Sequence, residues 1–125
     1  VITGAKGEKI DTMRMANLFL PDARMGLVRE KDGKSKIQQF AAAGFITRSP
    51  KMYETIDFYE TQIGITVNEF GNIAQVFQAY KTKGAKDAQG INSYQLMREN
   101  GEWRIISLIF QDETNTLTIP KKFLD

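Results

Sequence analysis

The sequence contains neither cysteine nor histidine. Without cysteine there is no disulfide bond, no thiolate nucleophile and no thiolate metal site, and the redox state of the compartment is left open. Without histidine the chain lacks the commonest general base and the commonest metal ligand. Any catalysis must therefore use carboxylates, tyrosine, lysine, arginine or bound water, and the sequence predicts no metal site and no cofactor.

An excess of one charge and long apolar runs are also lacking. The formal net charge is only +2, and the lysines are scattered over turns and the C-terminal end. A nucleic-acid surface would gather them on one face with aromatic residues between them, and no segment approaches the roughly 18 apolar residues of a membrane span. We therefore expect no nucleic acid and no membrane as a partner, and a soluble protein of the cytoplasm or periplasm.

The chain length and composition indicate a single domain over residues 1–125. Its hydrophobic content of 42% is ordinary for a globular protein, and 125 residues are too few for two independent cores. The chain begins at Val1 and shows no signal-peptide pattern, so we expect that preceding residues were processed away or left out.

What the sequence does contain is a strong hairpin signal at Asn100-Gly101. Asn-Gly supplies the two positive φ angles of a type I′ turn, and β-branched and aromatic residues lie on both sides over residues 90–111. With these two residues as the loop, the register pairs 98 with 103, 96 with 105, 94 with 107 and 92 with 109.

This register makes both faces of the hairpin apolar. One face carries Tyr94, Leu96, Trp103, Ile105 and Ile109, and the other carries Ile91, Ser93, Gln95, Met97, Ile106, Leu108 and Phe110. A sheet that is apolar on both faces needs cover on both. We therefore expect helices on one face and a second subunit on the other, which predicts a homodimer.

The remaining segments predict further helices and strands. Helices are expected over residues 11–19, with Asp11 as N-cap, and over 35–45, where Ser35 and Gln38 have capping-box spacing. Strands are expected over 22–30, 52–67 and 73–82, with turns at 31–34 and 71–72, a loop over 83–90, a break at 112–115 and a tail over 119–125. This order predicts an α+β fold with helices packed on one face of a curved antiparallel sheet.

Short motifs along the chain carry a resemblance to a known family. They are Asp11, Leu18-Phe19, Pro21 to Arg24, Phe58-Tyr59-Glu60, Phe70 to Ala74, Gly90 to Ser93, Gln95-Leu96 and Trp103 to Gln111. In that order they resemble uncharacterised bacterial proteins of the nuclear transport factor 2-like superfamily, which also holds ketosteroid isomerase, scytalone dehydratase and small, SnoaL-like polyketide cyclases. The resemblance spans about residues 10–111. It implies a cone of bent antiparallel sheet closed by helices over a pocket, usually dimeric through the outer face of the sheet, and an N-terminal helix that should precede Val1.

The resemblance does not supply catalytic residues one by one. The dehydratase and related members use a His–Asp pair, which this chain cannot form. The isomerase uses a pocket Asp base with a Tyr and a protonated Asp as oxyanion donors. Residues of these types are present, but none matches that motif by position: Asp11, Asp57, Tyr59, Tyr94 and Asp112.

The candidate site comes from the second hairpin, around Gly71-Asn72. Its predicted register pairs 70 with 73, 68 with 75, 66 with 77, 64 with 79 and 62 with 81. One face then carries Phe58, Glu60, Gln62 and Phe77 with Lys81 at its end, and the other carries Tyr59, Ile63, Ile65, Val67, Val76 and Tyr80. A carboxylate and an amide beside two phenylalanines are typical of an apolar pocket with a few placed polar groups. The alternative is that Glu60 forms a sheet-edge ion pair with Lys81.

Other candidate residues have two interpretations each. Ser93 and Gln95, on an apolar face, would line the cavity or hydrogen-bond across a dimer interface. Arg24 would anchor a ligand or, more in keeping with its position, bridge to a surface carboxylate. Trp103 is interpreted as packing rather than as a stacking platform. The roles of Gln111 and Glu113, near the mouth of a cone, stay undecided.

Three hypotheses about function follow. The leading one is a dimeric domain that binds an apolar or amphipathic small molecule, with Phe58, Glu60, Gln62, Phe77, Ser93 and Gln95 as ligand-binding candidates. The second is an isomerase, dehydratase or cyclase in which Glu60 is the base and Tyr59, Tyr94 or Gln95 polarises a carbonyl. The third is a solidly packed dimerisation or protein-interaction module. The residues alone leave open whether the protein is an enzyme.

Overall fold

One six-stranded sheet dominates the computed structural model, which describes residues 12–52, 58–84 and 86–125. The elements are α1 (Thr12–Leu18), β1 (Phe19–Lys31), β2 (Lys34–Ala41), α2 (Ala42–Met52), β3 (Phe58–Phe70), β4 (Ile73–Gly84), β5 (Ala88–Glu99), β6 (Glu102–Asp112) and the 3₁₀ turn η1 (Lys121–Phe123). The strand order is β2-β1-β6-β5-β4-β3, and all neighbours are antiparallel except β1 and β6.

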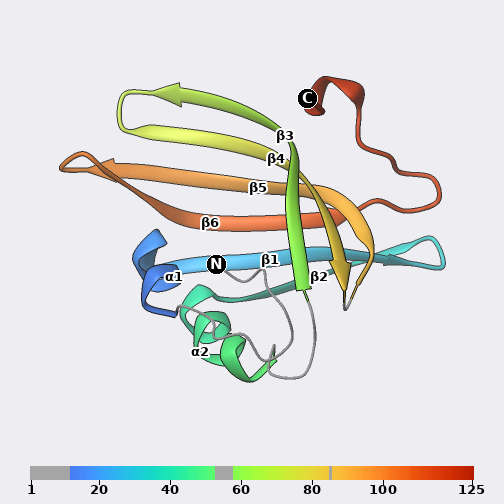
Figure 1. Cartoon of the computed structure of the whole chain (residues 1–125), viewed down its shortest axis with the longest axis horizontal. Helices are drawn as coiled ribbons and strands as arrows, with labels where there is room; N and C mark the ends of the chain where they lie inside the picture. The colour runs from blue at the N-terminus through green and yellow to red at the C-terminus, as the bar shows by residue number, and fades with distance from the viewer. Residues whose placement is uncertain (1–11, 53–57, 85) are drawn as a thin grey trace.

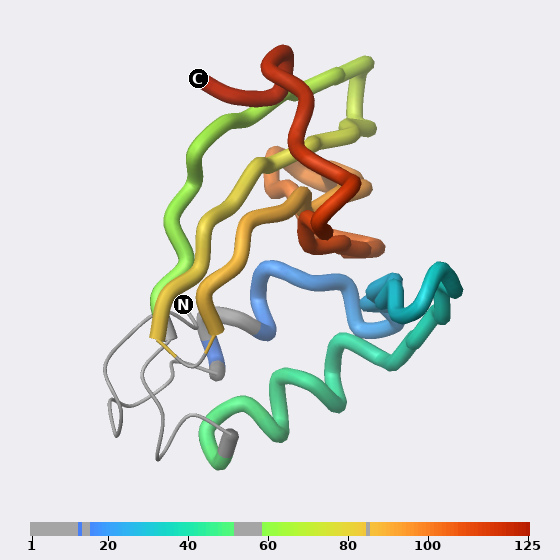
Figure 2. Tube along the Cα trace, turned by 90° about the vertical axis from the view of Figure 1, so that its right-hand side faces the viewer, coloured from blue at the N-terminus to red at the C-terminus, as the bar shows by residue number. Residues whose placement is uncertain are grey.

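The sheet is bent, and it is not closed into a barrel (Figure 1). Both α-helices of the described residues, α1 and α2, lie at the β1 side of the sheet, where α2 contacts β1 and β2. In the side view of Figure 2, β3, β4 and β5 curve downward toward the level of α2. The sheet therefore has a concave face and an outer face, as the predicted α+β class with a curved sheet requires.

The segment from residue 34 to residue 52 differs from its predicted structure. The helix predicted over 35–45 is wrong, because Lys34–Ala41 pairs with β1 as strand β2, and the helix α2 begins only at Ala42. Asp32 and Gly33 have φ angles of 55° and 75°, as a two-residue type I′ hairpin loop requires. The strand predicted from residue 52 begins at Phe58, since Met52 ends α2. Pairing across the hairpin outweighs the helical spacing of Ile37, Phe40 and Ala41.

Both long hairpins form as predicted near their turns and slip by one residue farther away. Arg98 pairs with Trp103 and Leu96 with Ile105, but a bulge follows, and Tyr94 then pairs with Leu108 instead of residue 107. In the β3–β4 hairpin, Gly64 pairs with Ala79 as predicted, whereas Gln62 pairs with Tyr80 instead of residue 81. Because side chains alternate between faces, each slip exchanges the two faces beyond the bulge.

The hydrophobic core lies on the concave side, between β1, α2 and β6. Its buried members are Ala23, Met25, Ala42 and Leu108, and Phe19, Phe40, Phe45, Tyr94 and Ile105 pack against them. Met25 and Leu108 are direct neighbours in the parallel pair of β1 and β6. Among the described residues, no helix has the length and apolar character needed to cross a membrane.

The C-terminal segment lies on the outer face of β3 and β4. The Phe123 ring packs on the Phe77 ring with centroids 5.3 Å apart, and the Asp125 backbone N–H donates to the Ile63 carbonyl at 3.1 Å. A Cβ atom at Gly64 would overlap the carbonyl oxygen of Phe123, so only glycine permits this close approach. This segment covers part of the outer face.

Candidate functional site

A cavity of about 920 Å³ opens on the concave face of the sheet. We call it the concave cavity. Its apolar lining comes from β1, β2, α2 and β6 and includes Phe19, Met25, Leu27, Phe40, Phe45, Ile105, Leu108 and Phe110. Its polar lining on β3 to β6 includes Glu60, Tyr80, Thr82, Asn92, Tyr94 and Asp112, which we call the polar wall.

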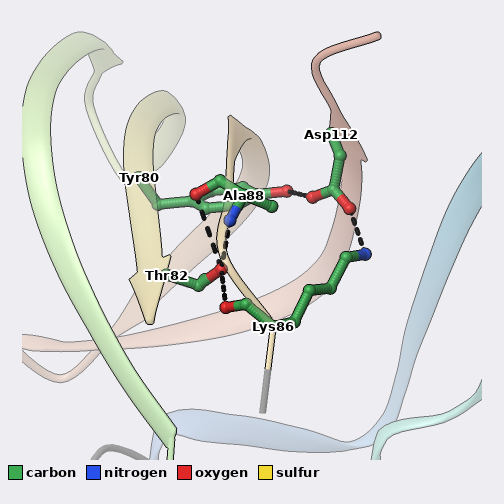
Figure 3. A network of polar contacts seen from close by, with 5 residues as sticks. All are labelled: Tyr80, Thr82, Lys86, Ala88 and Asp112. Carbon is green, nitrogen blue, oxygen red and sulfur yellow. Dashed lines mark hydrogen bonds and ion pairs between the residues drawn. The ribbon is translucent and has the colours of Figure 1, made fainter. Parts of the chain in front are cut away.

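The register of three adjacent strands places Tyr80 against Asp112. Tyr80 on β4 is opposite Gly90 on β5, and Gly90 is opposite Asp112 on β6. Because Gly90 has no side chain, the Tyr80 ring lies over it, and a Cβ atom there would overlap the phenol. The Tyr80 hydroxyl therefore reaches across β5 and donates to Asp112 Oδ1 (Figure 3).

The loop between β4 and β5 adds a cation to this pair. Lys86 Nζ forms an ion pair with Asp112 Oδ2, so the carboxylate has a phenol on one oxygen and an ammonium on the other (Figure 3). Thr82 holds the loop in place, since its hydroxyl donates to the Lys86 carbonyl at 2.9 Å and accepts from the Ala88 N–H at 3.1 Å. Thr82 is 5% exposed, so these contacts are shielded from water.

Gln78 connects the middle of the polar wall. Its Oε1 accepts from Asn92 Nδ2 at 3.3 Å and from the Tyr94 hydroxyl at 3.2 Å. Its Nε2 donates to Gln62 Oε1 at 2.8 Å. These bonds fix the side chains of Asn92 and Tyr94, which line the cavity.

The titratable groups of the polar wall act on one another. Burial raises the pKa of Glu60 above its ordinary value, and the negative charge of Asp112 adds to this, although a hydrogen bond from Asn92 opposes it. Burial, and then the charge of Glu60, raise the pKa of Tyr94 to about 12. Burial and the hydrogen bond to Asp112 raise the pKa of Tyr80 further. Glu60 thus holds a proton more tightly than an exposed carboxyl group does, beside a neutral phenol.

The predicted ligand-binding residues divide between the two faces. Glu60 lines the concave cavity, and Gln62 lies on the same face, exposed and bonded to Gln78. Phe77, Ser93 and Gln95 lie on the outer face: Phe77 packs on Phe123, Ser93 is opposite Phe77, and Gln95 Oε1 accepts from Ser107 at 3.2 Å. The prediction that Phe77 shares a face with Glu60 is therefore wrong, because the bulge after Gln62 reverses the alternation. The side chain of Phe58 lies outside the described part of the structure.

The same bulge separates Glu60 from Lys81. Glu60 is opposite Thr82, whereas Lys81 is opposite Thr61 and exposed on the outer face. The register that placed Lys81 on the face of Glu60 as its ion-pair partner is therefore wrong.

The remaining residues named in the sequence analysis lie partly at the cavity and partly away from it. Gln111 and Glu113 line the concave cavity; Gln111 Nε2 donates to Glu30 Oε1 at 3.2 Å, and Glu113 Oε2 accepts from the Ile119 N–H at 2.8 Å. Arg24 and Tyr59 are exposed. Trp103 is half-buried, with the Arg98 guanidinium 4.7 Å from its ring centroid. Asp11, with its predicted N-cap, and Asp57 lie outside the described residues.

The sequence analysis missed most of the polar wall. Tyr80, Thr82 and Asn92 of the wall and the neighbouring Lys86 were not predicted as site residues, Tyr94 was predicted as one of three groups that polarise a carbonyl, and Asp112 was named only for its residue type. A one-residue bulge leaves no compositional signal, so the faces could not be assigned. Gly90 was a usable signal, since a glycine inside a strand pattern marks a close approach. Among the described residues, no group of three or more acidic side chains is placed to hold a metal ion.

Comparison with solved structures shows which proteins have a similar fold. A protein of unknown function from Shewanella baltica, described as nuclear transport factor 2-like, superposes with a TM-score of 0.61 at 16% identity, over 87% of this chain and 83% of that one. The chain has the nuclear transport factor 2-like fold. A candidate ketosteroid isomerase from Shewanella frigidimarina has this similarity too, with a TM-score of 0.58 at 11% identity over 80% of each chain.

A third similar structure is described as having a cystatin-like fold. A Nostoc punctiforme protein of unknown function with a cystatin-like fold matches with a TM-score of 0.62 at 11% identity, over 84% of this chain and 78% of that one. No family model and no curated protein matches the sequence. At these identities the nuclear transport factor 2-like fold is shared, and the chemistry must be argued from the cavity itself.

Proposed function

We propose that this protein binds an apolar or amphipathic small molecule in the concave cavity. The observation that carries the proposal is a hollow of about 920 Å³ that joins a broad apolar lining to one polar wall. This is the composition of small-molecule sites in general. A cavity of this size favours a ligand-binding domain over a solidly packed interaction module. The proposal includes that the bent sheet and the helices surround the ligand as a cone.

A pair of tryptophan substitutions at neighbouring positions tests this proposal. Leu108 faces the cavity and is 9% exposed, while Ile109 faces outward and is 56% exposed. The neutral dye Nile red should bind the full chain with a blue-shifted emission. Leu108→Trp should obstruct the apolar part of the cavity and weaken binding, whereas Ile109→Trp should not. Circular dichroism checks that both variants fold, and Ile105→Trp replaces Leu108→Trp if that variant unfolds. If Ile109→Trp abolished dye binding and Leu108→Trp did not, the apolar site would lie on the outer face and the proposal would be overturned.

A second candidate function, acid–base catalysis on a carbonyl compound, has one specific observation in its favour. Glu60 lines the cavity with a raised pKa, and its charge acts on Tyr94. A carboxyl group of this kind can exchange a proton with carbon while a phenol polarises a carbonyl oxygen. The candidate ketosteroid isomerase among the structures of the same fold is consistent with such chemistry.

Hydrogen exchange at carbon tests this second candidate without a known substrate. The α-protons of 2-tetralone in D₂O should exchange faster with the protein than with buffer, as followed by NMR. Glu60→Gln should remove the acceleration, and Glu69→Gln, an exposed position on the same strand, should not. Equal exchange rates with the wild type and Glu60→Gln would exclude Glu60 as the base.

The outer face supports a proposal about assembly. Ile73, Met97 and Ile109 are 56%, 43% and 56% exposed on this face, whereas the C-terminal segment contacts the neighbourhood of Phe77 and Gly64. Exposed apolar side chains gathered on one sheet face are typical of an interface. A homodimer through this face is therefore part of the proposed function.

A further inference from the structure

The hydrogen-bond donors of the polar wall already donate within the protein. The Tyr80 hydroxyl donates to Asp112, the Tyr94 hydroxyl to Gln78, and the Thr82 hydroxyl to the Lys86 carbonyl. Asn92 donates to Gln78 and Gln111 to Glu30. A carboxylate that binds to these side chains would have to break these bonds, and the cations Arg29, Lys31 and Arg48 line the cavity from β1 and α2 instead.

The same side chains retain acceptor capacity toward the cavity. A phenol oxygen that donates its proton still has lone pairs, and a carboxylate has about four acceptor sites on its two oxygens. Asp112 contacts Tyr80 through one oxygen and Lys86 through the other. The polar wall therefore offers acceptors, and a ligand that donates several hydrogen bonds complements it.

The protein itself places an ammonium group on this wall. Lys86 Nζ contacts Asp112, yet the Lys86 side chain is 56% exposed, whereas that of Asp112 is 25% exposed. Lysine is a flexible point charge on a long stem, so its ammonium can swing away from a rim position. A ligand ammonium could take the same place against Asp112 without other rearrangement of the wall.

We infer that the concave cavity takes an amphipathic primary amine, whose ammonium displaces Lys86 from Asp112 while its apolar body lies against Leu108 and Phe110. This inference rests on the proposed small-molecule binding and names the class of ligand. The ligand ammonium would take over the charge that Lys86 now places against Asp112, and Glu60 on the same wall supplies a second carboxyl group.

Three naphthalene probes of matched size test the inference by isothermal titration calorimetry. They are 2-naphthylmethylamine, 2-naphthylmethanol and 2-naphthoate, which differ only in the polar group. The amine should bind at least about tenfold more tightly than the other two, as expected for a charge-assisted hydrogen bond in a partly shielded site. Asp112→Asn should bring the affinity for the amine down to that for the alcohol.

The Lys86→Met variant gives the sharpest readout. Removal of the internal ammonium should tighten binding of the amine, whereas Lys83→Met, at a nearby exposed position, should change nothing. Preferential binding of 2-naphthoate that is lost in Lys86→Met would show that Lys86 anchors an anion and would overturn the inference. Equal affinities for all three probes would also overturn it while leaving small-molecule binding intact. Failure of all three probes and of Nile red to bind would instead contradict the proposed function itself.

Discussion

Glu60 carries a carboxyl group on a wall that is largely shielded from water. Burial and the charge of Asp112 raise its pKa, and the hydrogen bond from Asn92 compensates only in part. The sequence predicts Glu60 on one face with Phe77, and the bulge after Gln62, between Glu60 and the turn, separates these two side chains. The partners of Glu60 could not be predicted. Asn92 lies on β5 and Asp112 on β6, and the pairing of these two strands slips by one residue between the predicted turn and these residues.

The raised pKa of Glu60 predicts a pH-dependent effect on stability. The folded-state pKa lies above the ordinary value of 4.5, so the folded chain holds this proton more tightly than the unfolded chain. The contribution of Glu60 to stability therefore falls as the pH rises from 4.5 through the folded-state pKa. Glu60→Gln should be more stable than the wild type at pH near 8, and the difference should close toward pH near 4. Urea unfolding over this pH series measures it, with Glu69→Gln as control. A Glu60→Gln variant less stable than the wild type at alkaline pH would contradict the assignment.

Trp103 gives a second prediction at this scale. The sequence favoured a buried packing role, but the side chain is half-buried and its visible partner is the Arg98 guanidinium. Trp103→Ala should therefore cost about 1–2 kcal/mol, from partial burial and a cation–π contact, whereas Leu108→Ala should cost about 2–5 kcal/mol as a core truncation. Urea unfolding of the two variants compares them. Equal losses would show that Trp103 belongs to the core.

At the scale of elements, the bulges in β3 and β6 decide which side chains line the cavity. Turn residues predict the register next to a turn, and this part was correct on both hairpins. One extra residue then brings Tyr80, Thr82 and Asn92 to the concave face and Phe77, Ser93 and Gln95 to the outer face. The error in β2 has a different cause: Asp32-Gly33 is a hairpin signal, but Ile37, Phe40 and Ala41 after it have the spacing of an amphipathic helix.

The close approach of the C-terminal segment to β3 gives a prediction about an element. Gly64→Ala introduces a Cβ atom that overlaps the Phe123 carbonyl, so the segment should detach. We expect faster tryptic cleavage after Lys121 and Lys122 and a loss of about 1–3 kcal/mol of stability. Thr66→Ala, two residues along the same face, should leave the cleavage rate unchanged. An unchanged rate in Gly64→Ala would show that the segment does not hold its place through this contact.

For the whole molecule, the strand-rich α+β class could be predicted and the order of strands could not. Local patterns predict hairpins, which join neighbours in the sequence. The parallel pair of β1 and β6 joins segments about 80 residues apart, and tertiary packing of Met25 on Leu108 specifies it rather than a local motif. This pair forms part of the apolar side of the cavity, so local sequence patterns could not predict the complete cavity lining either.

Assembly is the property of the whole molecule that the outer face predicts. The full chain should sediment as a dimer at micromolar concentration, and Ile109→Lys should shift it toward the monomer, because a charge would be buried at the interface. Val67→Lys, at an exposed apolar position on the concave side of β3, serves as the charge-matched control. A wild-type monomer across the concentration range would remove the case for a dimer.

Amide chemical shifts of the uniformly ¹⁵N-labelled chain, recorded during titration with neutral 2-naphthylmethanol, test most directly whether the concave cavity is the ligand site. The largest changes should fall on residues lining the cavity, such as Met25, Tyr94, Leu108 and Phe110, and the signals of the outer-face amides of Ile73 and Met97 should not shift. Changes confined to the outer face, or none at saturating probe, would contradict the cavity as the ligand site.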